Sequence, residues 1–378
     1  MRVESLSWAP GVGWSAPFPT ELDSPQTLVV AFGAPALADD PEPLGALRAA
    51  MPRSRLIGCS TSGEILGDAL SDDGVVASVA RFDRTRVETT VARVSGPAES
   101  AAAGRQVAEA LRAPDLRAVF VLSDGLLVNG SELVRGVASA LPSDVVVTGG
   151  LAGDGERFGR TWVLADGWPR DGTVAGVGLY GDAVEVGAGS FGGWDVFGPE
   201  RVITRAEGNV LYELDDQPAL SLYKEYLGDR AAGLPATAML YPLAVRSGRD
   251  VEPRTVRTIL AVDEADHSMT FAGDMPEGGL AQLMRANKDR LVDGAMQAAA
   301  LSAPGADAGP QLAVAVSCVG RRLVLGERTE EEIEATLEAL PAGSQLVGFY
   351  SYGEIAPHHS GYCDLHNQTM TVTTIGER

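Results

Sequence analysis

The sequence predicts a mixed α/β fold, made of two domains of related strand–helix–strand units with additional antiparallel strands. Three observations lead to it. An apolar run, a helical segment and a second apolar run follow one another three times along the chain. Each second run ends in a glycine-rich loop, and each loop leads into an alternating, strand-like segment. The six apolar runs occupy residues 27–32, 55–60, 118–123, 145–150, 312–318 and 346–351.

The helix of the first unit has a recognisable start. Asp40 precedes Pro41, which is a favourable N-cap followed by proline at the first helical position. Leu44, Leu47 and Met51 then fall on one helical face. That spacing predicts an amphipathic helix packed on a sheet.

The helices of the other two units carry similar signals. Asn129 or Ser131 can cap the second helix, and Thr329 with Glu332 has the spacing of a capping box in the third. Each start is followed by an apolar stripe, formed by Leu133, Val134, Val137 and Leu141 in the second unit and by Ile333, Leu337 and Leu340 in the third.

The glycine-rich loops of the first and third units share one pattern. GCSTSGEI (58–65) and GFYSYGEI (348–355) both read G-x-x-x-x-G-E-I, and the second unit has GGLAGDG (149–155) with Asp154 near the place of the glutamate. A tandem duplication explains this agreement. The alternative is a set of tight turns with glycine at positive φ, which explains the glycines but not the shared Glu-Ile.

A helix-like segment begins near Asp215, and we expect the domain boundary there. The expected domains are residues 1–215 and 216–378. The other predicted elements are helices over 100–111, 217–228 and roughly 279–301, a hairpin over 201–214, and a strand pair that turns at 264–267.

Charge and composition exclude several functions. The formal net charge is -21, from 51 acidic and 30 basic residues, so phosphate backbones and anionic lipid surfaces are repelled. We therefore expect no nucleic-acid partner and no membrane partner. Three cysteines do not make a disulfide framework, and no stretch approaches the roughly 20 apolar residues of a membrane span. The expected location is the cytoplasm.

Several strings resemble the FIST family of bacterial sensory modules, in which an N-terminal and a C-terminal FIST domain stand in tandem. They include GCSTSGEI and VVTGGLAGDG in the first half, and YPLAVR, SCVGRRLVLG and GFYSYGEIAP in the second. The resemblance implies intracellular signal transduction through a bound small ligand, such as an amino acid, without a cofactor. No output domain is attached, so we expect a separately encoded output protein as partner.

The loops provide the candidate ligand site, which we expect in a pocket between the two domains. Backbone amides freed by glycine can bind an anionic group, and Glu64 and Glu354 can receive an ammonium group. Arg246 and Arg321 can hold a carboxylate in a bidentate manner. The complete predicted set is Ser60, Thr61, Ser62, Glu64, Gly150, Asp154, Arg246, Arg321, Ser351, Tyr352 and Glu354. Alternatively, the hydroxyls cap local turns and the charged residues pair with one another.

A rival interpretation is a hydrolase or transferase that uses serine or cysteine in the glycine-rich loops. Such a nucleophile needs a neighbouring base, and the first half of the sequence contains no histidine. We therefore expect a protein that is not an enzyme. His358, His359, Cys363 and His366 are spaced loosely like a zinc site, and the sequence leaves open whether they bind a metal.

Overall fold

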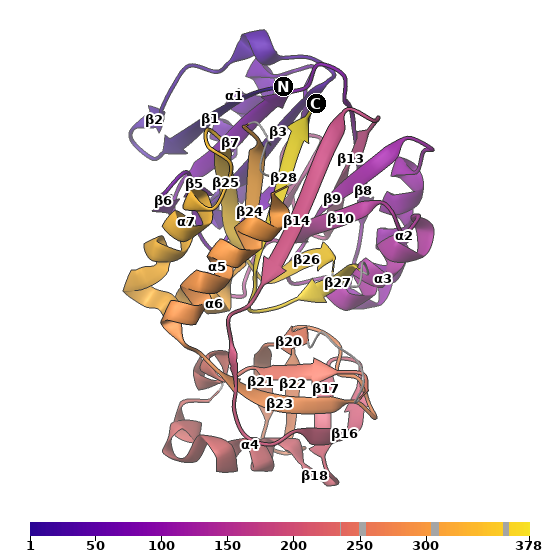
Figure 1. The fold of residues 1–378 in the computed structure, drawn as a ribbon, viewed down its shortest axis with the longest axis vertical. Coiled ribbons are helices and arrows are strands. Elements are labelled where there is room, and N and C mark those ends of the chain that lie inside the picture. The colour runs from indigo at the N-terminus through magenta and orange to yellow at the C-terminus, as the bar shows by residue number, and fades with distance from the viewer. Residues whose placement is uncertain (235, 249–254, 304–309, 358–362) are drawn as a thin grey trace.

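The computed structural model describes residues 1–234, 236–248, 255–303, 310–357 and 363–378. It is mixed α/β, as predicted, and has two parts (Figure 1). The larger part, here called the body, contains three sheets with helices around them. The smaller part, here called the lobe, comprises the described residues of 195–285 and hangs from one end of the body. Both chain termini lie at the opposite end of the body (Figure 1).

The first sheet shows the plan of each repeated unit. In it β3 (Thr27–Gly33) pairs in parallel with β4 (Arg55–Ser60) and antiparallel with β7 (Val75–Arg81). β1 (Arg2–Ala9) then pairs with β7 and extends the sheet, with β2 (Gly13–Trp14) beyond it. The predicted apolar runs are therefore the parallel pair at the centre of each unit.

The other two sheets repeat this arrangement. The second contains β8 (Arg86–Arg93), β9 (Leu116–Ser123), β10 (Val146–Leu151) and β13 (Thr173–Tyr180). The third contains β14 (Val184–Phe191), β24 (Leu312–Cys318), β25 (Gln345–Ser351) and β28 (Met370–Glu377). In both, the two central strands run parallel. The internal repeat of the sequence is therefore a repeat of whole sheets.

A short two-stranded arm follows each glycine-rich loop, and it joins the sheet of another unit. The arms are β5 (Glu64–Leu66) with β6 (Ala69–Ser71), β11 (Val163–Ala165) with β12 (Trp168–Arg170), and β26 (Gly353–Pro357) with β27 (Cys363–His366). The first arm pairs with β25, the second with β4 and the third with β10. This cyclic exchange ties the three units into one body.

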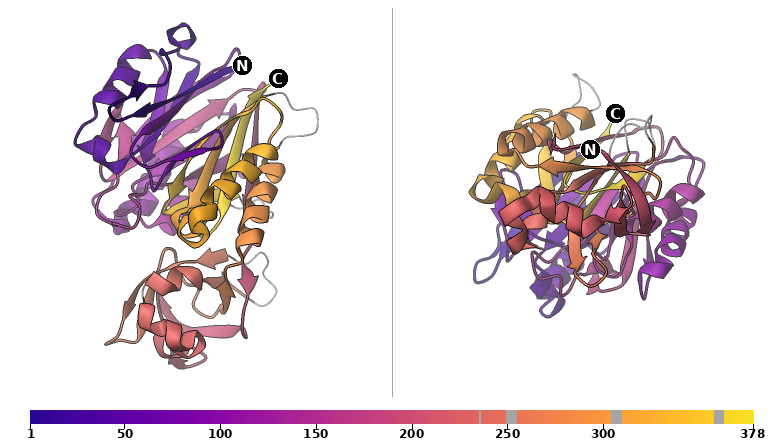
Figure 2. Two further views of the ribbon diagram at one scale, coloured as in Figure 1. Left: turned by 90° about the vertical axis from the view of Figure 1, so that its left-hand side faces the viewer. Right: turned by 90° about the horizontal axis from the view of Figure 1, so that it is seen from below.

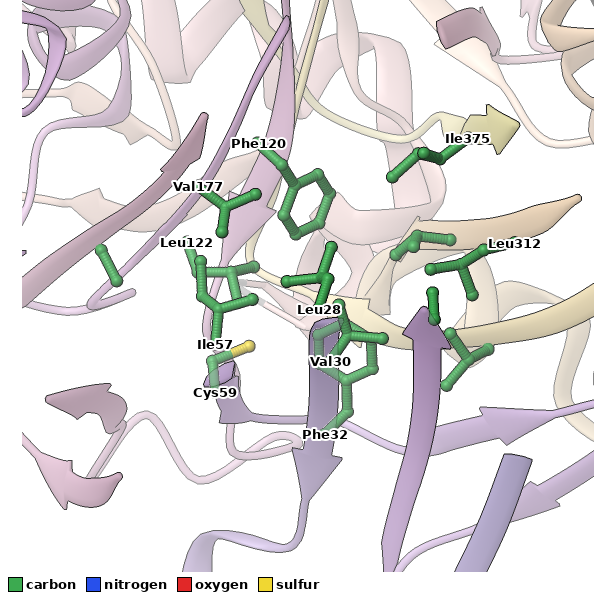
Figure 3. Packing of buried hydrophobic residues seen from close by; sticks show 14 of the residues in the cluster. Leu28, Val30, Phe32, Ile57, Cys59, Phe120, Leu122, Val177, Leu312 and Ile375 are labelled. Carbon is green, nitrogen blue, oxygen red and sulfur yellow. The ribbon is translucent and has the colours of Figure 1, made fainter. Parts of the chain in front are cut away.

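The inner faces of the three sheets meet in one apolar core (Figure 3). On β3, Leu28, Val30 and Phe32 point into that core, whereas Val29 and Ala31 face the first helix. Alternation along a strand sends successive side chains to opposite faces, and here both faces are covered. That is why these strands are continuous apolar runs.

Helices cover the outer faces of the sheets. They are α1 (Glu42–Ala50) on the first sheet, α2 (Ser100–Leu111) and α3 (Gly130–Ala140) on the second, and α5 (Lys288–Ser302) and α7 (Thr329–Glu338) on the third. The short α6 (Val319–Leu325) follows β24 directly. Among the described helices none is long and apolar enough to span a membrane.

The lobe is inserted between β14 and α5 and lies at one end of the body (Figure 2). It has its own apolar core. Its strands are β15 (Asp195–Val196), β16 (Arg201–Glu207), β17 (Val210–Leu214), β18 (Gln217–Pro218), β19 (Leu243–Arg246), β20 (Thr255–Arg257), β21 (Ile259–Asp263), β22 (Ser268–Phe271) and β23 (Leu280–Arg285), and its α-helix is α4 (Ala219–Leu227). The domain boundary predicted between residues 215 and 216 falls inside this lobe. It differs from the division into body and lobe, and it stays a prediction.

Three local predictions about helices were wrong. The segment Leu280–Arg285 is strand β23, and α5 begins only after Asn287, which caps it. The N-cap of α1 is Pro41, without a side-chain cap from Asp40. Thr329 lies inside α7 and donates to the carbonyl of Gly326, so it forms no capping box. By contrast, Asn129 caps α3 by accepting from the N–H of Glu132 at 3.1 Å.

Candidate functional site: a cavity between the body and the lobe

Three glycines occupy equivalent positions in the units, Gly58, Gly149 and Gly348. A Cβ at these positions would lie 2.0, 1.8 and 2.1 Å from a carbonyl oxygen of the neighbouring parallel strand. Aligning the units on them places Glu64 and Glu354 at the same point of their arms, paired with β25 and β10. In the second unit that position holds Val163, not Asp154, because the second loop contains an insertion.

The glycine-rich loops bind one another through their backbones and close a ring. The three hydrogen bonds are Ser62 N–H to Tyr350 O at 2.8 Å, Gly153 N–H to Ser60 O at 3.0 Å, and Tyr352 N–H to Leu151 O at 3.2 Å. Each joins a loop to the neighbouring unit at the same structural position. These three backbone amides therefore have partners within the protein, and the anion site expected at the loops stays a prediction.

A hydroxyl and the glutamate of each G-x-x-x-x-G-E-I loop bind each other. Thr61 donates to Glu64, and Ser351 donates to Glu354 at 2.7 Å. Each carboxyl group accepts further hydrogen bonds. Glu64 accepts from Ser71 Oγ at 3.1 Å and from Gly74 N–H at 3.4 Å. Glu354 accepts from Thr369 Oγ1 at 2.9 Å and from Thr369 N–H at 3.2 Å. Both glutamates are buried. They anchor the arms within the protein.

Burial raises the pKa of both glutamates, to about 7 for Glu64 and to about 8 for Glu354, against the hydrogen bonds that lower it. The unfolded carboxyl ionises near its ordinary pKa of 4.5. The protonated, folded Glu64 is therefore favoured below pH 4.5, and this stabilisation is lost as the pH rises towards 7.

Replacing Glu64 by Gln should remove that pH dependence, because the amide stays neutral. The free energy of unfolding of the variant, relative to wild type, should increase by about 3 kcal/mol between pH 4.5 and 8. Urea denaturation at several pH values measures this difference. Glu109→Gln, on the exposed side of α2, is the control. Parallel curves for Glu64→Gln and wild type would contradict the prediction.

The side chains of Ser60, Ser62 and Asp154 also help to hold the ring of glycine-rich loops together. Ser60 Oγ accepts from Trp162 N–H at 3.0 Å, and Ser62 Oγ accepts from Gly155 N–H at 2.9 Å. Asp154 accepts from two backbone N–H groups of its own loop and from the hydroxyl of Tyr352. Although burial raises the pKa of Asp154, these hydrogen bonds hold it below its ordinary value. Gly150 lies in β10 opposite Glu354 and contributes close packing.

The two predicted arginines bind carboxylates of the protein itself. Arg321 is fully buried and forms an ion pair with Glu332 at 2.5 Å. Arg246 lies in β19 of the lobe and bonds to Glu200 at 2.7 Å. Neither residue lines the cavity described next.

A cavity of about 260 Å³ lies between the body and the lobe. On the body side it is formed at the carboxyl ends of the parallel strands β9, β10 and β24, the edge where α/β proteins commonly bind ligands. On the lobe side it is formed by the loops next to β17, β21 and β22. The lining residues are Pro97, Gly125, Leu126, Val128, Asn129, Leu151, Phe158, Asn209, Met239, Thr258, Leu260, Phe271, Ala272, Gly273, Cys318, Val319, Gly320 and Tyr352.

Of the predicted site residues, Tyr352 lines this cavity and Ser62 lines a separate surface groove. The tyrosine ring stacks on Phe158, with centroids 4.7 Å apart and planes 13° apart. Phe158 has φ +47°, which is strained for a bulky residue, and its side chain is 41% exposed. The inserted loop of the second unit thus holds an aromatic side chain at the mouth of the cavity.

Thr258 was missed by the sequence analysis. Its side chain is 5% exposed and lines the cavity, and its Oγ1 has no hydrogen-bond partner in the described structure. The threonine sits in RTVRTILAV, between the predicted arginine string and the predicted strand pair. No pattern in that segment marks it, because its importance follows from where the lobe meets the body.

The thiols of Cys59 and Cys318 are buried, and the histidines form no metal cluster in the described part of the chain. Burial raises the pKa of Cys59 and of Cys318, so both thiols stay protonated and weakly nucleophilic. Within the described residues, no three His, Cys, Asp or Glu side chains are placed together so that they could hold a metal ion. His358 and His359 of the predicted cluster lie outside the described residues, and His366 Nε2 is 3.1 Å from the carbonyl of Ala356.

Comparison with known proteins identifies both halves of the chain. The FIST N domain model matches residues 27–217, and the FIST C domain model matches residues 219–357. No curated protein matches the chain. Among solved structures, a cyanuric acid hydrolase from A. caulinodans aligns over 100% of this chain and 99% of its own, with 10% identity and a TM-score of 0.38.

Proposed function

The chain belongs to the FIST family, whose domains are sensory domains of signal transduction, and we propose that it senses a small ligand bound between the body and the lobe. The observation that carries this proposal is the cavity itself. Its walls come from the ends of the body strands and from the loops of the lobe. A ligand that contacts both parts stabilises one arrangement of the lobe, which is the requirement for a sensor.

The links between the lobe and the body suit such a role. Asp274 of the lobe pairs with Arg135 at 3.0 Å and accepts from Asn129 Nδ2 at 3.2 Å, both in the body. Arg257 of the lobe donates to the carbonyl of Leu365 at 2.8 Å. These polar contacts border the cavity, since Asn129 also lines it. In the proposed mechanism, ligand binding is therefore coupled to the formation of these contacts between the lobe and the body.

The proposed role is binding without catalysis. The loop hydroxyls are engaged within the protein: Ser60 accepts from a backbone N–H, while Thr61 and Ser351 donate to the carboxyl groups that fix the arms. The signal would pass to a separately encoded output protein.

Filling the cavity tests the proposal. Ala272 lines the cavity, and Ala272→Phe should occupy its volume and weaken the binding of any ligand there by tenfold or more. The measurement is the thermal shift across a panel of amino acids, small carboxylates and neutral ring amides, followed by calorimetry on whatever binds. Ala110→Phe, on the exposed side of α2, makes the same change elsewhere and should bind normally. Equal binding to both variants would place the ligand outside the cavity, and turnover of a bound compound would favour the enzyme interpretation.

A further inference from the structure

We infer that the ligand is an uncharged, planar ring compound with a hydrogen-bonding edge, and that the hydroxyl of Thr258 recognises this edge. This inference rests on the proposed function, because it concerns the occupant of the same cavity. It replaces the amino acid or small carboxylate first expected.

The charge of the cavity argues against an ionised ligand. None of the described lining residues carries a formal charge. The nearby acidic groups already have partners: Asp154 accepts from the hydroxyl of Tyr352, and Asp274 pairs with Arg135. Burying a carboxylate or an ammonium group without an opposite charge is strongly unfavourable. A zwitterionic amino acid would have to leave both of its charges unpaired here.

The size and the walls of the cavity favour a ring. Its volume of about 260 Å³ is enough for a single ring, since an apolar cavity of about 150 Å³ binds benzene. Phe158, Phe271 and Tyr352 supply aromatic surface, and the stacked pair of Phe158 and Tyr352 presents flat faces at the mouth. Flat apolar surfaces of this kind pack best against another planar group.

One polar position gives the site its specificity. Thr258 Oγ1 is buried without a partner, although its own carbonyl accepts from Ala272 N–H at 2.9 Å. A buried hydroxyl left without a hydrogen bond is unfavourable, so a ligand that supplies one gains affinity. Asn209 lines the same side of the cavity, and its Nδ2 donates to the carbonyl of Phe271 at 2.8 Å. That bond directs the Asn209 amide and leaves its side-chain oxygen as an acceptor. A carboxamide-like edge, with one donor and one acceptor, complements these two groups.

A matched series of single-ring compounds tests the inference. Benzamide has a neutral hydrogen-bonding edge, benzoate has a charged one, and toluene has none. By saturation-transfer NMR and competition titration, benzamide should bind wild type at least about tenfold more tightly than benzoate. Thr258→Val keeps the shape of the side chain and removes the hydroxyl. It should weaken benzamide about fivefold and leave toluene unchanged.

Two further outcomes separate this inference from the proposed function. If Ala272→Phe abolishes the binding of benzoate or phenylalanine, and these bind at least as well as benzamide, the ligand class is overturned while the cavity remains the ligand site. If Thr258→Val leaves the affinity for benzamide unchanged, the assigned role of the hydroxyl is overturned. If benzamide binds equally to wild type and Ala272→Phe, it binds outside the cavity and the inference fails.

Discussion

Replacing Arg321 by Met should lower the free energy of unfolding by about 3–5 kcal/mol, the usual result of removing one partner from a buried ion pair. The guanidinium is fully buried and pairs with the equally buried Glu332. It also donates to three backbone carbonyls, those of Gly192, Leu291 and Gln368. Methionine fills much of the volume but leaves the carboxylate and the carbonyls without their donor.

Chemical denaturation measures this loss, and two further variants make it specific. Arg117→Met removes an exposed arginine whose partner Asp182 is also exposed, so it should cost less than about 1 kcal/mol. The double variant Arg321→Met/Glu332→Leu removes the stranded carboxylate and should recover part of the stability. Stability of Arg321→Met within 1 kcal/mol of wild type would contradict the assignment of Arg321 as a structural centre.

The sequence could predict the repeated units because they depend on local patterns. Strands buried on both faces need continuous apolar runs, and Arg55–Ser60 and Leu312–Cys318 are strands over the predicted residues. Helix α2 likewise spans Ser100–Leu111 as predicted. Local hydrophobic spacing and the glycine-rich breaks were sufficient for these elements.

The destination of each arm could not be predicted in the same way. The G-x-x-x-x-G-E-I pattern indicates that a strand ends and another begins, but it does not state which sheet the next strand joins. In the structure Glu64 pairs with β25 of the third unit. Polar residues of the loop hold this arm in place, because Thr61 donates a hydrogen bond to Glu64. The shared pattern therefore marks the attachment point of an arm.

The cavity was also beyond prediction, because it forms between segments that are distant in the chain. Thr258, Phe158 and Cys318 approach one cavity only when the lobe is placed against the body strands. The pocket predicted from the sequence lay between the domains 1–215 and 216–378 and included the charged arginines. Arg321 and Arg246 have partners inside the protein, and burial of that kind leaves no mark in a single sequence.

Replacing Gly348 by Ala should destabilise the third unit by about 3 kcal/mol or more, the upper part of the range for overpacking. The added Cβ would lie 2.1 Å from the carbonyl oxygen of Ala315 on β24. Because the obstacle is backbone in a parallel strand pair, no rotamer change relieves the contact, and the two strands must separate. Gly96→Ala adds the same methyl group where no atom lies within 4 Å, and its extended backbone accepts alanine. Thermal and urea unfolding of the two variants should therefore diverge widely. Equal stability would show that β24 and β25 can shift apart freely, and it would remove the physical basis for aligning the three units on Gly58, Gly149 and Gly348.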